Sequence, residues 1–314
     1  MLEVVSITLP IFALIGIGYG CTRAGLFGQS DIRMLGRFVL QVALPALLFN
    51  AVGGTPFSEV FDAAYLLVFG LGTLATLAAA LIWFHFSGME SSRFGVATLG
   101  AAVPNSALVG YPIFLLAFPA VAGKILALNM IVENFLIIPI SFALISLHDR
   151  RGAGSLPRLL AGILGDILRR PMVIGLLIGM AVSVTQVPVP AAICRLAALL
   201  AGASAPVALF YIGGVLAGAS LKGNRAIAAQ IVVAKLVIHP ALTLAALTGL
   251  TATGLVAPDP AFRAPLFVSA ALPMFATFTL VAQEKGHEGM ASIAMLAATC
   301  ISFVTISALL LVFG

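Results

Sequence analysis

Apolar residues occur in ten long runs along the chain, separated by short stretches that hold charges or clusters of glycine and proline. A transmembrane helix needs about 20 mostly apolar residues, and each run is close to that length. The expected helices cover residues 3–22, 34–53, 63–86, 94–118, 122–147, 171–188, 194–219, 226–250, 262–283 and 289–313. The pattern predicts an all-α membrane protein with ten transmembrane helices.

The composition agrees with a membrane location. Of the 314 residues, 61% are hydrophobic and 9% are charged, whereas a soluble domain carries about 25% charged residues. A net charge of +5 would suit a nucleic-acid partner. The basic residues, however, are scattered through short loops between apolar runs, which is typical of membrane proteins. We therefore expect the lipid bilayer as the partner of this surface, and no nucleic acid.

The positions of the basic residues predict an orientation. With the N-terminus outside, the cytoplasmic loops hold twelve of them: Arg23, Arg33, Arg37, Arg93, Arg150, Arg151, Arg158, Arg169, Arg170, Lys222, Arg225 and Lys285. The outer loops and ends hold only three, namely Lys124, Arg195 and Arg263. The positive-inside rule then predicts that both termini lie outside. The expected location is the plasma (bacterial inner) membrane.

A polar stretch at residues 149–170 divides the chain into two halves, 1–148 and 171–314. Within it, apolar residues recur at helical spacing between charges: Leu159, Leu160, Ile163, Leu164 and Ile167 alternate with Arg158, Asp166, Arg169 and Arg170. This pattern predicts a short amphipathic helix on the cytoplasmic surface that links the halves.

The two halves resemble each other at two proline-centred segments. Residues 43–49 (ALPALLF) are similar to residues 204–210 (SAPVALF), at an offset of 161. Residues 101–104 (AAVP) are similar to residues 270–273 (AALP), at an offset of 169. Because each half has five expected helices, the second half would start on the opposite side of the membrane. An inverted repeat of this kind is common in secondary transporters.

Two of the repeated prolines, Pro104 and Pro273, lie near the middle of the fourth and ninth runs. A proline inside a helix removes a backbone donor, and bare backbone groups are tolerated in a membrane only where they are buried in protein or line a cavity. If both helices are broken and cross, two half-helix N-termini meet, and their N–H groups favour an anion. The candidate substrate-binding residues are Pro104, Asn105, Ser106, Asn129, Pro273, Met274, Phe275 and Thr277. The alternative is that each proline only kinks a packed helix.

Ionisable residues inside the apolar runs are candidates for ion or proton coupling. Glu133 lies in the fifth run, one turn after Asn129, and Lys235 lies in the eighth run, one turn before His239. A lone charge at this depth costs about 2.5–3.5 kcal/mol, so each needs a partner or water. We hypothesise that Glu133 and Lys235 face each other, directly or through water. A purely structural ion pair is the alternative, and His239 could simply bond a backbone carbonyl.

The same residues resemble the auxin efflux carrier family, in the wide sense that includes bacterial malonate and malate permeases. The motif-bearing segments are Pro104-Asn105 through Gly110-Tyr111-Pro112, Ala270-Ala271-Leu272-Pro273 through Ala282-Gln283-Glu284, Leu44-Pro45-Ala46-Leu47-Leu48-Phe49 and Lys235-Leu236-Val237-Ile238-His239-Pro240. They span nearly the whole chain. The resemblance implies that the family's substrate asparagine falls on Asn105.

The resemblance also implies an architecture, shared with bile-acid symporters and sodium/proton antiporters. Helices four and nine would cross. Helices 1, 2, 6 and 7 would form a scaffold domain, and helices 3–5 and 8–10 a transport domain that slides against it. Two departures disfavour auxin and favour a small carboxylate: the linker is short, and Met274 and Phe275 stand where plant members carry polar or glycine residues.

The expected function is secondary transport of a small organic anion, a mono- or dicarboxylate or an auxin-like acid. The chain has no GxSxG, HExxH or Walker motif, so we expect no enzyme activity, no cofactor and no metal site. The coupling ion could be H⁺ or Na⁺, and a homodimer through the scaffold domain is left open. The alternatives are a sodium- or proton-coupled symporter of larger organic acids, a channel and an intramembrane enzyme.

Overall fold

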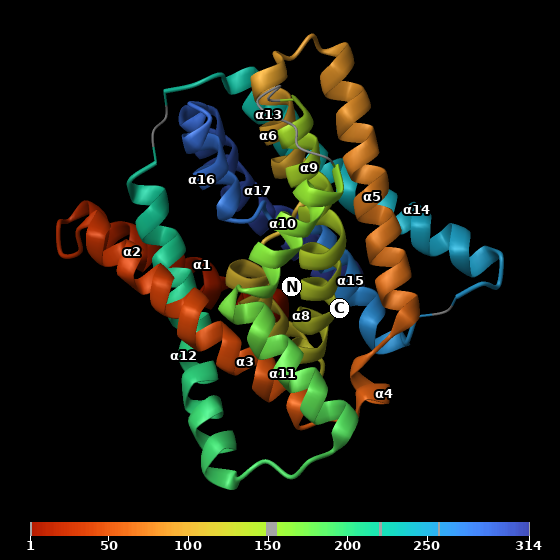
Figure 1. Cartoon of the computed structure of the whole chain (residues 1–314). Helices are drawn as coiled ribbons and strands as arrows, with labels where there is room; N and C mark the ends of the chain where they lie inside the picture. Colours follow the sequence, from red (N-terminus) through yellow and green to blue (C-terminus); the bar gives the residue numbers. More distant parts are fainter. Residues whose placement is uncertain (1, 149–155, 220–221, 257, 314) are drawn as a thin grey trace.

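The computed structural model describes residues 2–148, 156–219, 222–256 and 258–313, and its regular structure in this part of the chain is helical (Figure 1). The helices of the first half are α1 (Leu2–Arg23), α2 (Gln29–Phe38), α3 (Leu44–Gly53), α4 (Phe57–Val60), α5 (Ala63–Phe86), α6 (Ser91–Ala102), α7 (Tyr111–Ala117), α8 (Ala122–Val132) and α9 (Ile138–His148). Those that follow are α10 (Leu156–Leu168), α11 (Pro171–Thr185), α12 (Ala191–Ala217), α13 (Arg225–Val233), α14 (His239–Ala252), α15 (Pro260–Ala271), α16 (Thr277–Glu284) and α17 (Glu288–Phe313).

Within the described ranges, six helical stretches are long and apolar enough to cross a membrane: Gln29–Gly53, Ala63–Phe86, Ala122–Ser146, Ala191–Ala217, Arg225–Ala252 and Glu288–Val312. The pair α10–α11, bent by 76°, would add a seventh if it forms one span. The prediction of an all-α, multi-pass membrane protein is confirmed at this level. The count of ten spans and the inverted relation of the halves stay predictions.

Three of these stretches and the shorter apolar helix Ser106–Ala117 each contain a π-helical turn, and proline explains its position. The turns are η1 (Val39–Ala43), η2 (Ser106–Gly110), η3 (Glu133–Ile137) and η4 (Ala234–Ile238). Each ends two residues before a proline, respectively Pro45, Pro112, Pro139 and Pro240. Proline lacks an N–H and its ring crowds the carbonyl four residues earlier, so the preceding turn widens. Glu133 and Lys235 both lie in these widened turns.

Glycines allow some helices to pack with their backbones in contact. Gly213 on α12 lies against the backbone of Ile15 on α1, and Gly175 on α11 lies against the backbone of Pro45 on α3. A β-carbon at either glycine would collide with that backbone. Small residues are the usual means of close helix approach in lipid, where no hydrophobic effect drives helices together.

The helices pack in two sets. The first set is α1, α3, α11 and α12: α12 packs on α1 and α3, and α3 packs on α11. The labels α3, α11 and α12 lie in the lower half of Figure 1. In the second set, α5 packs on α6 and α14, α6 packs on α9, and α13 packs on α17. The two sets also touch, for example where α3 meets α8.

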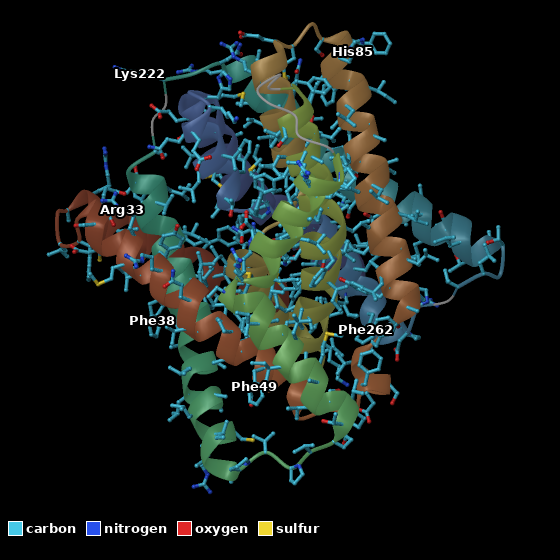
Figure 2. All side chains as sticks on the ribbon, in the orientation of Figure 1. Arg33, Phe38, Phe49, His85, Lys222 and Phe262 are labelled. Carbon is cyan, nitrogen blue, oxygen red and sulfur yellow. The ribbon has the colours of Figure 1, made fainter. Side chains whose placement is uncertain are left out.

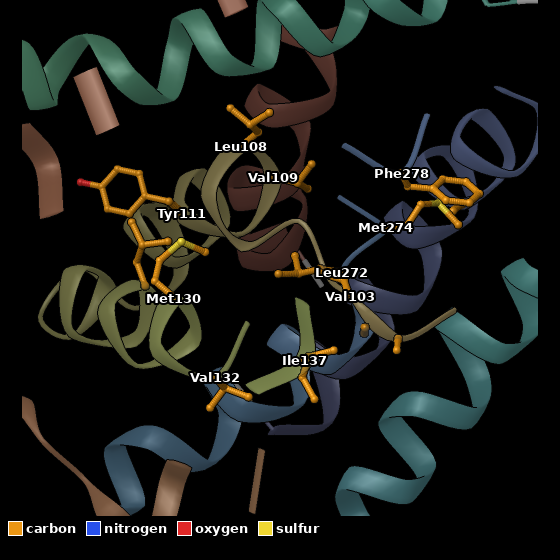
Figure 3. Close-up of a cluster of buried hydrophobic side chains, with 14 of the residues drawn as sticks. Val103, Leu108, Val109, Tyr111, Met130, Val132, Ile137, Leu272, Met274 and Phe278 are labelled. Carbon is orange, nitrogen blue, oxygen red and sulfur yellow. The ribbon is translucent and has the colours of Figure 1, made fainter. Parts of the chain in front are cut away.

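Buried apolar side chains surround the region where the second set is interrupted (Figure 3). Val103 and Leu272 lie beside each other at the centre of this cluster, and Met274 lies next to Phe278. Each of these four side chains is buried. This packing seals the interruptions of the fourth and ninth runs away from lipid.

The predicted linker helix is present as α10, with its apolar residues on two sides. Ile167 is buried, whereas Leu160, Leu164 and Leu168 are exposed along one stripe. An uncovered stripe on an amphipathic helix suits the interfacial position that the sequence predicts. Residues 149–155, which include Arg150 and Arg151, lie outside the described residues, and so does the predicted boundary of the first half at 148/149.

Candidate functional site

The fourth and ninth runs are both broken, and their breaks lie side by side. Helix α6 ends at Ala102 and α15 ends at Ala271. Between these ends and the next helical turns, the chain is extended and forms an antiparallel bridge that pairs Pro104 with Met274. The backbone N–H of Asn105 donates to the carbonyl of Pro273 over 2.9 Å, and the N–H of Phe275 donates to the carbonyl of Val103 over 3.2 Å.

The helical turns that follow the breaks begin with unpaired backbone donors. The half-helix η2–α7 begins at Ser106, and α16 begins at Thr277. The N–H groups of Ser106, Ala107, Ala276 and Thr277 make no hydrogen bond with the described residues. Free N–H groups at a helix start carry partial positive charge and suit an anion.

Two cavities meet at this crossing. The larger has a volume of about 240 Å³ and lies between α2 and α12 on one side and α16 and α17 on the other. Its polar lining residues are Gln29, Arg33, Asn105, Tyr211, Thr279, Gln283, Glu288, Ser292 and Thr299. Arg33, labelled in Figure 2, lies in the middle of α2.

The smaller cavity has a volume of about 70 Å³. Its wall includes all four residues with unpaired N–H groups, together with Pro104, Asn105, Glu133, Asn134, Arg170 and Phe275. Asn105 and Ala276 line both cavities. The crossing therefore separates two hollow regions that share these two residues.

Asn105 is held so that its amide nitrogen remains available. Its Oδ1 accepts a hydrogen bond of 3.2 Å from the N–H of Leu108, which caps the turn that begins at Ser106. Its Nδ2 makes no hydrogen bond with the described residues. The side chain thus satisfies one backbone donor and presents another donor between the two cavities.

A chain of buried polar side chains begins at Ser106 and Glu133 in the wall of the smaller cavity and continues into the protein. The Ser106 hydroxyl donates to Oε1 of Glu133 over 2.5 Å. Asn129 Nδ2 donates to Ser106 Oγ over 3.0 Å and to Ser269 Oγ over 2.9 Å, while the Tyr65 hydroxyl donates to Asn129 Oδ1 over 2.7 Å. These side chains lie on α5, η2, α8, η3 and α15, so the chain ties the start of the half-helix to several helices of the second set.

Lys235 is the centre of a second buried cluster. Its Nζ lies 2.5 Å from Nδ1 of His239 and donates to the carbonyl of Ala270 over 3.0 Å. His239 Nε2 is 3.0 Å from Thr73 Oγ1, whose own hydroxyl donates to the carbonyl of Phe69. The Thr73 hydrogen is therefore used, and Nε2 is the donor of that contact.

Of the two arrangements expected for Glu133 and Lys235, the direct ion pair is absent among the described residues. The two groups still interact electrostatically at longer range. The π-turns place Glu133 against Ser106 and Lys235 against His239. The two clusters end on adjacent residues of α15, because Ser269 belongs to the first and the Ala270 carbonyl to the second. A link through water stays a prediction.

Comparison with known proteins decides the family. A model of the family described as "Membrane transport protein" matches residues 4–153 and 155–310, which is nearly the whole chain. This chain belongs to the membrane transport protein family. The resemblance to auxin efflux carriers that the proline motifs indicated is thereby confirmed at the level of the family.

Several relatives of this membrane transport protein are themselves named as transporters. The chain is 31% identical over 99% of its length to a Rhizobium meliloti (strain 1021) protein named "Putative malonate transporter", of which it covers 96%. It is 26% identical to "Uncharacterized transporter YfdV" of Escherichia coli (strain K12), covering 74% of each. It is 25% identical over 74% of its length to the Mus musculus "Lysosomal cholesterol signaling protein", but covers only 28% of that protein.

Some of the predicted site residues of this membrane transport protein line the smaller cavity, and the others lie behind its wall. Pro104, Asn105, Ser106, Phe275 and Thr277 line the smaller cavity. Pro273, Met274 and Asn129 line neither of the two cavities. Met274 is fully buried in the apolar cluster, Pro273 supplies the carbonyl that Asn105 bonds, and Asn129 holds Ser106 from behind. Of the three proposed coupling residues, Glu133 lines the smaller cavity, whereas Lys235 and His239 do not.

Sequence reasoning did not single out Tyr65, Ser269 or Arg170. Tyr65 and Ser269 are buried partners of Asn129, and their signal was a hydroxyl inside an apolar run. Arg170 was counted only as a loop charge, yet it lines the smaller cavity. Its signal was the proline that follows it, which starts α11 directly after the arginine.

Proposed function

We propose that this membrane transport protein is a secondary transporter of small organic anions, a class that includes mono- and dicarboxylates such as malonate or malate. The anion would bind in the smaller cavity, between the two broken helices. The observation that carries the proposal is the composition of that cavity wall. It joins the unpaired N–H groups of both half-helices to the free amide nitrogen of Asn105.

The chemistry of these groups supports an anion rather than a cation or an apolar ligand. The N-terminus of a helix carries partial positive charge, and the free N–H groups there commonly bind anions. A small carboxylate can accept several such bonds at once. The 31% identical relative is named for malonate, which supports this substrate class. Auxin-like acids are the larger members of the same class.

The mechanism that we propose is alternating access of the elevator type. Ten transmembrane helices in two inverted repeats of five would form a scaffold domain of helices 1, 2, 6 and 7 (α1, α2–α3, α11 and α12). The remaining helices would form the transport domain. The close packing of α1, α3, α11 and α12 supports this division, and the larger cavity between α2, α12, α16 and α17 would be the path on one side.

The remaining parts of the proposal concern setting and coupling. Both termini would lie outside the bacterial inner membrane, and a homodimer would form through the scaffold. Glu133, Lys235 and His239 would couple transport to H⁺ or Na⁺. Uptake into proteoliposomes under an imposed proton gradient or sodium gradient tests the coupling. If uptake responds to neither gradient, the coupling part of the proposal is wrong and transport is facilitated exchange.

A second candidate, a coupled symporter of larger organic acids, draws support from the larger cavity. Its volume of about 240 Å³ exceeds what a three-carbon acid requires and approaches the range of about 300–1,000 Å³ typical of pockets for larger ligands. A thermal-shift screen of the purified protein separates the candidates. Stabilisation by malonate or malate supports the first, and stabilisation only by bulkier acids supports the second.

A further inference from the structure

A guanidinium group lines the smaller cavity. Arg170 Nη1 donates a hydrogen bond of 3.3 Å to Oδ1 of Asn134. The described residues offer no other hydrogen bond and no ion pair to this side chain. Because an arginine has five N–H donors, most of its hydrogen-bonding capacity remains for a ligand.

The local sequence explains why Arg170 is held at the cavity. Helix α10 ends at Leu168, α11 begins at Pro171, and the two helices meet at a bend of 76°. A residue before proline is restricted to extended conformations, and Arg170 has φ −67° and ψ 127°. The turn therefore fixes the backbone of Arg170 between two helices, one of which, α11, belongs to the first set.

The electrostatics of this position favour an added negative charge. Arg170 caps the N-terminus of α11, where the helix dipole repels a cation. The helix starts at Ser106 and Thr277 border the same cavity. One carboxyl group, Glu133, also lines it, but its Oε1 accepts from Ser106 and it makes no ion pair with Arg170. Asp166 on α10 interacts with Arg170 electrostatically, but it makes no ion pair with it and does not line the cavity.

We infer that Arg170 binds a second carboxylate of the substrate, so that the site selects short dicarboxylates over monocarboxylates. This inference rests on the proposed function and adds a residue to the same site. One carboxylate would lie at Asn105 and the N–H groups of Ser106 and Ala107, and the other would lie at the guanidinium, which can bind a carboxylate in a bidentate manner. The cavity volume of about 70 Å³ restricts the carbon chain between them to a short one.

The test compares two ligands of nearly equal shape, malonate and its monoamide malonamate, on purified full-length protein by titration calorimetry. In Arg170→Gln, the Kd for malonate should rise about ten-fold or more, because a charged partner is lost. The Kd for malonamate should stay within about two-fold. Arg170→Lys keeps the charge without the planar fork and should weaken malonate binding by less. Arg169→Gln is the matched control, since Arg169 is exposed and lines neither cavity.

Three results would overturn the inference. Equal weakening of both ligands in Arg170→Gln would assign Arg170 a structural role through Asn134. Unchanged malonate binding in the same variant would remove it from the site. If Arg170→Gln does not fold, Arg170→Lys supplies the same comparison between ligands, and equal effects there carry the same meaning. Wild-type protein that binds neither ligand nor any other small carboxylate overturns the proposed function as well, which separates the two failures.

Discussion

The hydroxyl of Ser106 donates a hydrogen bond of 2.5 Å to Oε1 of Glu133. Ser106 is the first residue of the half-helix η2–α7, and Glu133 is the first residue of the π-turn η3 between α8 and α9. The contact therefore joins these two membrane segments. Both side chains are buried, so the bond is shielded from water. The half-helix and the α8–η3–α9 stretch should therefore move together whenever the site moves.

Replacing Ser106 with alanine should destabilise the protein, because Glu133 loses its donor in a buried site. Leaving a buried group unsatisfied costs about 1–3 kcal/mol, which should appear as a lower melting temperature in detergent. The matched control is Ser146→Ala, since Ser146 donates to the carbonyl of Phe142 one turn earlier and makes no other hydrogen bond with the described residues. Equal melting temperatures for the two variants would show that the contact with Glu133 contributes no stability.

Replacing Asn105 with alanine should abolish carboxylate binding while the protein stays folded. The variant also loses the cap on Leu108 N–H, a loss of about 0.5–2 kcal/mol. Asn224→Ala separates the two effects, because Asn224 caps α13 in the same way, through Ile227 N–H at 3.1 Å, and lines neither cavity. Both variants should melt earlier, but only Asn105→Ala should lose the thermal shift with malonate. Retained binding in Asn105→Ala would sink this assignment.

Alanine at Pro104 or Pro273 should lower uptake, because a more regular helix would withdraw the unpaired N–H groups from the cavity. The control is Pro206→Ala, since Pro206 lies inside the unbroken helix α12. Uptake of labelled malonate into proteoliposomes measures the effect. Uptake at the wild-type rate in both crossing variants would contradict the role of the breaks.

Lys235 should be more strongly coupled to His239, which it contacts, than to Glu133, with which it interacts only at longer range. Residues in contact show interaction energies of about 0.5–3 kcal/mol, whereas separated residues add within about 0.3–0.5 kcal/mol. Double-mutant cycles built from Lys235→Met, His239→Ala and Glu133→Gln, read as free energies of unfolding, compare the two pairs. A larger coupling for Lys235 with Glu133 would restore the link through water that the sequence suggested.

Much of the helical arrangement could be predicted from the sequence, because apolar runs and their charged borders depend on the bilayer more than on tertiary contacts. The run at 63–86 became α5 with the same bounds, and the breaks at Pro104 and Pro273 were both found. The π-turns were missed. Their signal, a proline two residues beyond each turn, does not distinguish a kink from a widened turn without the packing around it.

The site could be predicted only in part. Asn105 and Ser106 follow directly from the position of Pro104. The partners of Glu133 and Lys235 could not be found, since periodicity gives the depth of a side chain but not the neighbour that it contacts. Glu133 accepts a hydrogen bond from Ser106 and does not contact Lys235. The direct contact of Lys235 is instead with His239, one turn later on the same helical stretch. The role of Arg170 at the cavity could not be predicted, because in the sequence it is one of several arginines in a polar linker.

Counterflow tests the central claim that a small carboxylate is carried across the membrane through the crossing of the broken helices. Proteoliposomes are loaded with unlabelled malonate and diluted into a trace of labelled malonate. We predict a transient accumulation of label above equilibrium, which is lost in Asn105→Ala and kept in Asn224→Ala. Label that only equilibrates, as through a channel, or that does not enter for malonate, malate or any other small carboxylate, would contradict the account.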